Sequence, residues 1–207
     1  MGPVKSSVPR SGTGESFEFW REFMIDLKTR GLTGVHLVIS DAHAGLTAAI
    51  AQQFQYATWQ RCRVHFMRNV QGAVAKKHKP VVTAAMQTVF AHTEPEEISA
   101  QWDQVAAGLK QTVPKAADMM IEAKADVLAF MPYPAVHWRK IWSNNPIERL
   151  NKEVARRSDV VEIFPNPASF VRLGTAVVIE AHDERQVEGV QESCASPSRR
   201  LTRTISI

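Results

Sequence analysis

The chain has 207 residues, of which 44% are hydrophobic and 22% charged, so it is long enough for one ordinary domain and too apolar for a disordered protein. Its formal net charge is +4 and its pI is about 9.2. Two cysteines are too few for the disulfide framework of a secreted protein, and no apolar run approaches the roughly 18 residues of a membrane span. The sequence therefore predicts a cytoplasmic protein.

The first part of the chain predicts helices packed around a buried strand. Residues 1–15 are rich in Pro, Gly and Ser and predict a disordered leader. Apolar residues then recur at helical spacing up to a glycine that suits a helix stop: Phe17, Trp20, Met24, Leu27 and Gly31. The run VHLVIS (35–40) has the pattern of a strand buried in a sheet, and the Ala-rich helix AGLTAAIAQQF follows it. This order predicts an α/β fold.

The stretch from Ala42 to Thr93 contains no Asp or Glu, although it collects basic residues. These are Arg61, Arg63, Arg68, Lys76, Lys77 and Lys79. Such a stretch is either a solvated face or a phosphate-binding surface, and the sequence leaves both open. Within it, ATWQRCRVHFM (57–67) predicts a short strand that leads into a basic helix.

A helical insertion is predicted over residues 80–135. From Pro80 to about Phe130 the pattern is helical, with breaks near Pro95 and Pro114, while acidic residues return and strand signals vanish.

The insertion divides the predicted core into two parts, residues 16–79 and 136–185. The Pro-rich connector MPYPAVHW leads into the second part, where a helix is predicted at about 167–184. Residues 186–207 lose helical periodicity and predict a disordered tail.

One acidic residue interrupts the basic run SNNPIERLNKEVARR (143–157). Asn145 suits an N-cap and Pro146 the first helical position, which puts Glu148 where a capping-box acid belongs. On a helical wheel the core-facing residues are Ile147, Leu150 and Val154, and the opposite basic stripe is Asn145, Arg149, Lys152 and Arg156. Glu148 lies at the edge of this stripe. A helix cap, an ion pair with Lys152 and a metal-binding carboxylate are all open alternatives for it.

Asp41 provides a second carboxylate, directly after the predicted strand 35–40. Open α/β sheets bind ligands at the carboxyl ends of their strands, although an Asp here also suits the cap of the next helix. Two carboxylates on rigid elements beside basic surfaces are what Mg²⁺-dependent phosphoryl transfer requires. Cys62-x-x-His65 has the spacing of half a zinc site, but no second Cys/His pair stands nearby. A buried thiol with a His turned toward phosphate or toward the site fits this pair better.

Three segments in this order, SDAHAGL (40–46), CRVHFMRN (62–69) and NNPIERLNKEVARRS with the following FPN (144–166), resemble the catalytic region of Mutator-type bacterial insertion-sequence transposases. The resemblance covers roughly residues 16–184. It implies an α/β fold with a partial RNase H-like core interrupted by an α-helical insertion. It also implies DDE chemistry, with metal-dependent cleavage and transfer of DNA strands by Mg²⁺ or Mn²⁺. Asp41 and Glu148 are then catalytic residues and metal ligands, while Cys62 and His65 match a family signature of open role.

The implied partner is DNA, at transposon ends and target sites, bound by a homo-oligomer at the nucleoid. The residues predicted to contact DNA are Arg149, Lys152, Arg156, Arg157, Asn145, Arg61, Arg63 and Arg68. The family's first catalytic Asp has no counterpart, because Asp26, the only Asp before Asp41, falls within an amphipathic helix. We therefore expect a truncated copy that is inactive alone, with a catalytically dead DNA-binding remnant as the alternative.

Overall fold

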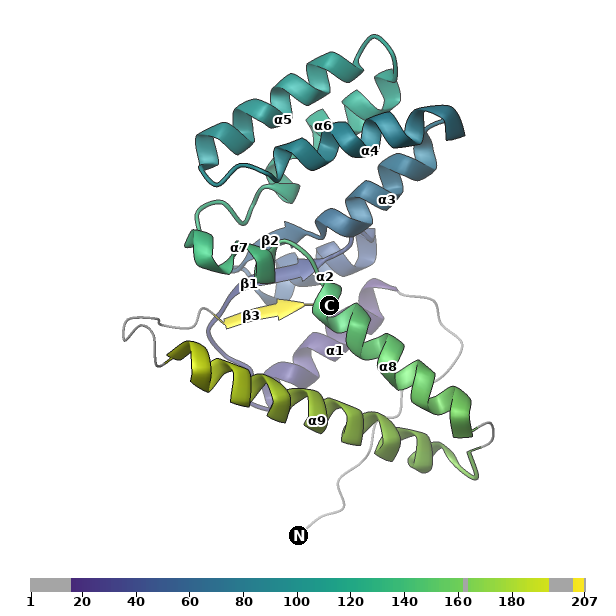
Figure 1. The fold of residues 1–207 in the computed structure, drawn as a ribbon. Coiled ribbons are helices and arrows are strands. Elements are labelled where there is room, and N and C mark those ends of the chain that lie inside the picture. Colours follow the sequence, from purple (N-terminus) through teal and green to yellow (C-terminus); the bar gives the residue numbers. More distant parts are fainter. Residues whose placement is uncertain (1–15, 162–163, 194–202, 207) are drawn as a thin grey trace.

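The computed structural model describes residues 16–161, 164–193 and 203–206, so the predicted leader at 1–15 lies outside the described residues. Figure 1 shows their arrangement. In chain order the elements are α1 (Phe17–Thr29), β1 (Val35–Ser40), α2 (Ala44–Gln53), β2 (Thr58–Arg61), α3 (Arg63–Ala73), η1 (Lys76–His78), α4 (Lys79–Val89), α5 (Pro95–Leu109), α6 (Pro114–Val127), η2 (Ala135–His137), α7 (Trp138–Ile141), α8 (Asn145–Val161), α9 (Pro167–Ser193) and β3 (Arg203–Ser206). None of the described helices is long and apolar enough to cross a lipid bilayer.

Within the described residues, three strands form one parallel sheet in the order β2-β1-β3. Leu37 stands opposite Thr58 and Ser40 opposite Arg61, so β1 and β2 end side by side. Because parallel strands present their carboxyl ends at the same edge, the residues that follow β1 and β2 emerge together. This edge positions the candidate site.

Helices cover both faces of the sheet, as the order of predicted elements indicates. On one face, Leu37 and Ile39 join a core that runs through α3 into α4, α5, α6 and α7. On the other face, Val38 packs with residues of α1 and α2. In Figure 1, α3 connects the sheet with the group of α4, α5 and α6. The mixed α/β fold is therefore confirmed, and the predicted insertion shares one continuous core with the sheet.

The end of the chain differs from the prediction of a disordered tail over 186–207. α9 continues to Ser193, and residues 203–206 form β3 against the free edge of β1. A four-residue strand carries little intrinsic preference, and its conformation comes from pairing with a distant edge. Local periodicity could not reveal that partner.

The core that links the insertion to the sheet contains Trp102, which is 1% exposed and stacks on Phe66 at 5.7 Å between ring centroids. Its indole N–H donates to the Met120 carbonyl at 2.9 Å. We expect Trp102→Ala to lower the free energy of unfolding by about 3–5 kcal/mol, because it leaves a cavity in the core. Urea titration followed by circular dichroism measures this change. Tyr56→Ala, at a side chain that is 97% exposed, is the control and should stay within about 0.5 kcal/mol of the wild type. Equal effects of the two substitutions would contradict a shared core.

Candidate functional site

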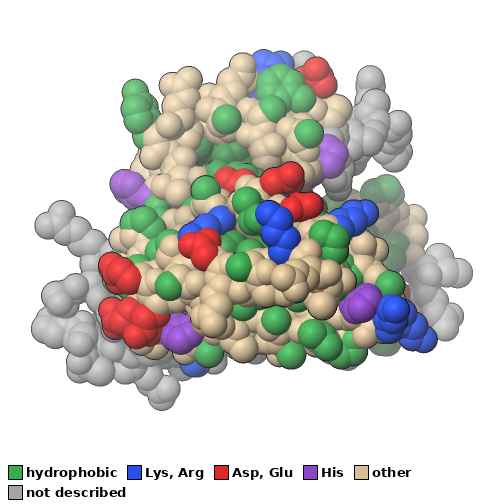
Figure 2. Space-filling view, turned by 90° about the horizontal axis from the view of Figure 1, so that it is seen from above, with side chains coloured by type: hydrophobic (Ala, Val, Ile, Leu, Met, Phe, Trp, Pro, Cys, Tyr) green, Lys and Arg blue, Asp and Glu red, His purple; other side chains and the backbone are tan. Residues whose placement is uncertain are grey.

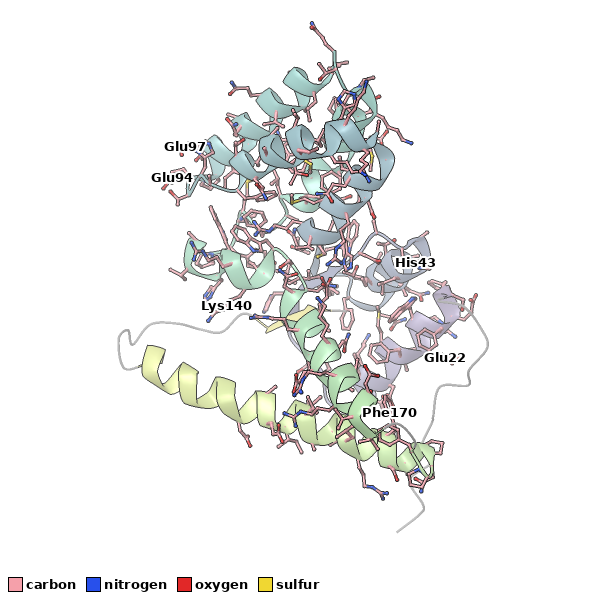
Figure 3. All side chains as sticks on the ribbon, turned by 45° about the vertical axis from the view of Figure 1, so that its right-hand side comes forward. Glu22, His43, Glu94, Glu97, Lys140 and Phe170 are labelled. Atoms are coloured by element: carbon pink, nitrogen blue, oxygen red, sulfur yellow. The ribbon has the colours of Figure 1, made fainter. Side chains whose placement is uncertain are left out.

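Asp41 directly follows β1 at the carboxyl edge of the sheet. Its half-buried carboxylate accepts a hydrogen bond from the His43 backbone N–H at 3.3 Å, and His43, labelled in Figure 3, is the N-cap of α2. Asp41 therefore shapes the turn between strand and helix, but it is not itself the cap residue. One carboxylate oxygen remains without a hydrogen bond from the described residues.

Cys62 follows β2 at the same edge and is the N-cap of α3. Its backbone N–H donates to the Ser40 carbonyl at 2.7 Å, which ties it to the residue before Asp41. Its thiol contacts the Asn144 side-chain oxygen at 2.9 Å inside the protein, where Cys62 is 0% and Asn144 6% exposed. This buried contact joins the edge of the sheet to the segment that precedes α8.

α8 begins one residue earlier than the sequence predicts. The Asn144 carbonyl accepts from the backbone N–H groups of Ile147, at 3.0 Å, and Glu148, at 3.1 Å. Since an N-cap residue accepts the first bond of its helix, Asn144 and not Asn145 is the N-cap, and Glu148 stands one position beyond the capping-box site. The capping-box interpretation of Glu148 is therefore wrong.

The Glu148 carboxylate is held by two residues of α3. His65 Nε2 lies 3.2 Å from Glu148 Oε1, and the two terminal nitrogens of Arg68 lie 3.3 and 3.2 Å from its two oxygens. The Glu148 side chain is 21% exposed, compared with 54% for Arg68. Glu148 thus has ion-pair partners, but they are not the Lys152 that helical spacing indicated.

Arg61 ends β2 at this edge and interacts electrostatically with Asp126, which the sequence pattern does not indicate. The Arg61 guanidinium lies 4.9 Å from the Phe66 ring centroid, and burial lowers its pKa against the opposing charges of Asp126 and Asp41. Burial also raises the pKa of Asp126, and the Arg61 charge partly offsets that shift. Asp126 lies near the C-terminal end of α6, and no local pattern marks it as a neighbour of Arg61.

The side chains near this edge can be compared with the ligands that a Mg²⁺ ion requires. Within the described residues, no group of three or more His, Cys, Asp or Glu side chains could hold a metal ion. Mg²⁺ is commonly held by one or two carboxylates together with substrate phosphates. Two carboxylates such as Asp41 and Glu148 are therefore too few by themselves, and the remaining oxygen ligands would have to come from a bound substrate.

The predicted DNA-contacting residues differ in what they do in the folded protein. Arg149 and Lys152 are exposed on α8 and form no ion pair with any described residue. Arg156 and Arg157 bind Glu153, with N–O distances of 2.7 and 2.8 Å. Arg157 also lies 2.7 Å from Glu180 of α9. Two of the basic residues of α8 are thus available to an anion, and two already have internal partners.

Arg63 packs against aromatic rings and is half-buried rather than exposed at the surface. Its guanidinium lies 3.6 Å from the Trp142 ring centroid and 4.8 Å from that of Phe90, and burial lowers its pKa to about 10. Its backbone N–H donates to the Trp142 carbonyl at 3.0 Å. Among the other predicted contacts, Asn145 is exposed, whereas Arg61 is half-buried and Arg68 pairs with Glu148. The face shown in Figure 2 mixes acidic and basic side chains and forms no patch of one sign.

These observations define an α/β protein in which Asp41 lies at the carboxyl edge of a parallel sheet. Buried contacts of Cys62 link this edge to the segment before α8, the helix that carries Glu148. The family model described as "Transposase, Mutator family" matches residues 10–187. The chain belongs to this family, as the three sequence segments indicate.

Several curated proteins are similar to the chain over most of its length. The transposase for insertion sequence element IS1081 of Mycobacterium tuberculosis is 48% identical over 165 residues, which are 80% of this chain and 40% of that protein. The transposase for ISRM5 of Rhizobium meliloti is 37% identical over 86% of this chain and 44% of its own length. The transposase for IS256 in transposon Tn4001 of Staphylococcus aureus is 37% identical over 83% of this chain and 44% of its own length. The chain therefore spans less than half the length of these relatives.

The ion pairs on α8 make a prediction about pH. Hydrogen bonds from Arg156 and Arg157 lower the pKa of Glu153 to about 2, from an ordinary value of 4.5. Since the folded-state pKa lies below the unfolded one, these pairs stabilise the fold above pH 4.5 and lose their effect as the pH falls toward 2. Carbon NMR of the side-chain carboxyl should give a pKa of about 2 for the wild type. The Arg156→Gln/Arg157→Gln variant should return it toward 4.5, and a wild-type value already near 4.5 would mean that these pairs do not persist in solution.

Proposed function

We propose that this chain forms the part of an insertion-sequence transposase that binds DNA and provides two catalytic carboxylates, Asp41 and Glu148. Family membership and the names of the similar proteins support this function. The observation that carries the residue assignment is a line of contacts at the sheet edge. Cys62 bonds the residue before Asp41 through its backbone, and through Asn144 it reaches the first turn of the helix that carries Glu148. Two carboxylates far apart in sequence thus belong to one structural unit.

The proposed reaction is cleavage of a phosphodiester bond at the element ends and transfer of the strand to target DNA. A divalent ion, Mg²⁺ or Mn²⁺, would activate the attacking oxygen and stabilise charge on the transferred phosphate. Asp41 and Glu148 would hold this ion together with DNA phosphate oxygens. The parallel strands with helices on both faces support a partial RNase H-like core over 16–79 and 136–185, with the insertion at 80–135.

A catalytically dead DNA-binding remnant is the second candidate. The described residues contain no cluster of three metal ligands, and Glu148 is already bound by His65 and Arg68. A triad needs one further acid. Asp26 is a poor choice because it lies within the amphipathic helix α1, where it faces Arg30 one turn later. Both candidates bind DNA at the nucleoid, and the resemblance implies a homo-oligomer for the active form. They differ in whether an ion is bound between the carboxylates.

DNA binding should depend on the basic residues of α8 that have no internal partner. For each DNA phosphate that the protein no longer neutralises, the slope of log K against log salt should decrease in magnitude by about 0.9, so Arg149→Ala/Lys152→Ala should lower it by about 1.8. The measurement is fluorescence anisotropy of a labelled duplex at several salt concentrations. Arg156→Ala/Arg157→Ala removes the same charge from the same helix and is the matched control. It should change the slope less, because Glu153 and Glu180 already hold these groups. Equal slopes for the wild type and Arg149→Ala/Lys152→Ala would show that this part of α8 is only a solvated face.

The metal site can be mapped without requiring strand transfer. Fe²⁺ with ascorbate and peroxide cuts a polypeptide near the residues that bind the ion. If Asp41 and Glu148 hold an ion with DNA phosphates, the chain should be cut near both residues when DNA is present, and much less without it. Glu148→Gln should abolish these cuts. The control Glu153→Gln changes another acid of α8 and should leave them unchanged. Cuts that are absent with DNA, or unaffected by Glu148→Gln, would favour the DNA-binding remnant.

A further inference from the structure

Cys62 and His65 stand one helical turn apart at the start of α3, and both contact the start of α8. The Cys62 thiol lies 2.9 Å from Asn144 Oδ1, and His65 Nε2 lies 3.2 Å from Glu148 Oε1. Asn144 and Glu148 are also one turn apart. Residues three or four positions apart lie on the same side of a helix, so two neighbours on one helix meet two neighbours on the other.

We propose that Cys62-x-x-His65 is a two-point latch that sets the position of Glu148, with Cys62 as a positioning residue that acts through Asn144. Cys62 fixes the backbone where α8 begins, and His65 fixes the carboxylate one turn later. The proposal rests on the proposed function only in treating Glu148 as catalytic. It gives the spacing of Cys62 and His65 a meaning other than zinc binding.

Burial supports a latch rather than a reactive or metal-bound thiol. Cys62 is a free cysteine with 0% exposure, whereas Asn144 and the preceding Ser143 are 6% and 2% exposed. A thiol enclosed in this way cannot reach a substrate. Its thiol donates instead to the amide oxygen of Asn144 at 2.9 Å, in a buried contact whose loss has a cost in free energy.

The backbone around Cys62 makes the latch rigid. Its N–H bonds the Ser40 carbonyl at 2.7 Å, and its carbonyl accepts from Phe66 N–H at 2.9 Å in the first turn of α3. Next to it, Arg63 binds the Trp142 carbonyl and stacks on the Trp142 ring. The segment 142–144 is therefore held by two consecutive residues, the N-cap Cys62 and the first residue of α3, and this fixes where α8 begins.

Amide hydrogen exchange measures the backbone half of the latch directly. The N–H groups of Ile147 and Glu148 both donate to the Asn144 carbonyl, so their protection reports how firmly α8 begins. Cys62→Ala should speed their exchange about fivefold, which corresponds to the loss of one buried hydrogen bond. Cys62→Ser keeps a donor and should restore protection to near the wild-type level.

The control is Val70→Ala on the same helix, at a side chain that is also 0% exposed. It should lower overall stability without a selective effect on Ile147 and Glu148. His65→Gln should leave both amides protected, since His65 contacts only the Glu148 side chain. If Cys62→Ala proves too unstable, a thermodynamic cycle of Cys62→Ser with Asn144→Asp still tests the contact, because coupled partners give non-additive changes.

Three results would overturn the latch. These are unchanged exchange in Cys62→Ala, a Cys62→Ser variant that behaves like Cys62→Ala, or additive effects in the cycle. None of these measurements depends on metal or DNA. Failure of the proposed function would instead appear in the Fe²⁺ mapping, where Glu148→Gln would have no effect while the exchange results stood.

Discussion

Burial of β1 on both faces is the constraint that decides where the other elements lie. Leu37, Val38 and Ile39 are all 0% exposed, and β1 has a paired strand on each side. Its backbone groups are satisfied by β2 and β3, and its alternating side chains require a helical layer above and below. Polar groups can then emerge only where the strand ends. The position of Asp41 follows from this geometry.

The start of the helix that carries Glu148 is held beside the carboxyl edge of the sheet, because α4, α5, α6 and α7 share one core with the sheet. One apolar cluster runs from Ile39 through Phe66 and Trp102 to Ile141. Phe130 contacts both Trp138 and Trp142, so the end of the insertion is packed against the connector that returns the chain to the sheet. Aromatic packing thus positions the start of α8, as strand pairing positions Asp41. In both cases the contacts join residues that are far apart in the sequence.

The sequence predicts the structure best where the conformation of a segment depends on the residues of that segment alone. The strand 35–40 and the helices on either side follow from apolar periodicity, and the prolines at 95 and 114 mark the starts of α5 and α6. β3, the Arg63 stack on Trp142 and the proximity of Asp126 to Arg61 depend on partners distant in sequence. No local pattern encodes them.

The partners of Glu148 lie between the features that local sequence determines and those that depend on distant residues. The acid-free run from 42 to 93 indicated a basic surface, but it also means that His65 and Arg68 have no acidic neighbour within their own segment. A carboxylate that arrives from elsewhere is then the natural counter-ion, and Glu148 at the edge of its helix provides it. The acid-free run left a solvated face and a phosphate-binding surface both open, and in the folded chain Glu148 is one anion that its basic residues bind.

This internal pairing does not remove Glu148 from the proposed chemistry. Arg68 is 54% exposed, and an ion pair so open to solvent contributes only about 0–1 kcal/mol. A divalent ion with DNA phosphate ligands carries twice the charge of a guanidinium and can displace Arg68 from the carboxylate. The displaced guanidinium would find a new partner in the same phosphates, since arginine binds phosphate as readily as carboxylate. His65 is less exposed, at 28%. Together with the Cys62 contact it would keep α8 in place against α3 during this exchange. Arg68 and His65 therefore have separate roles around Glu148 in the proposed site. Arg68 is exchangeable with the substrate, and His65 is a structural partner.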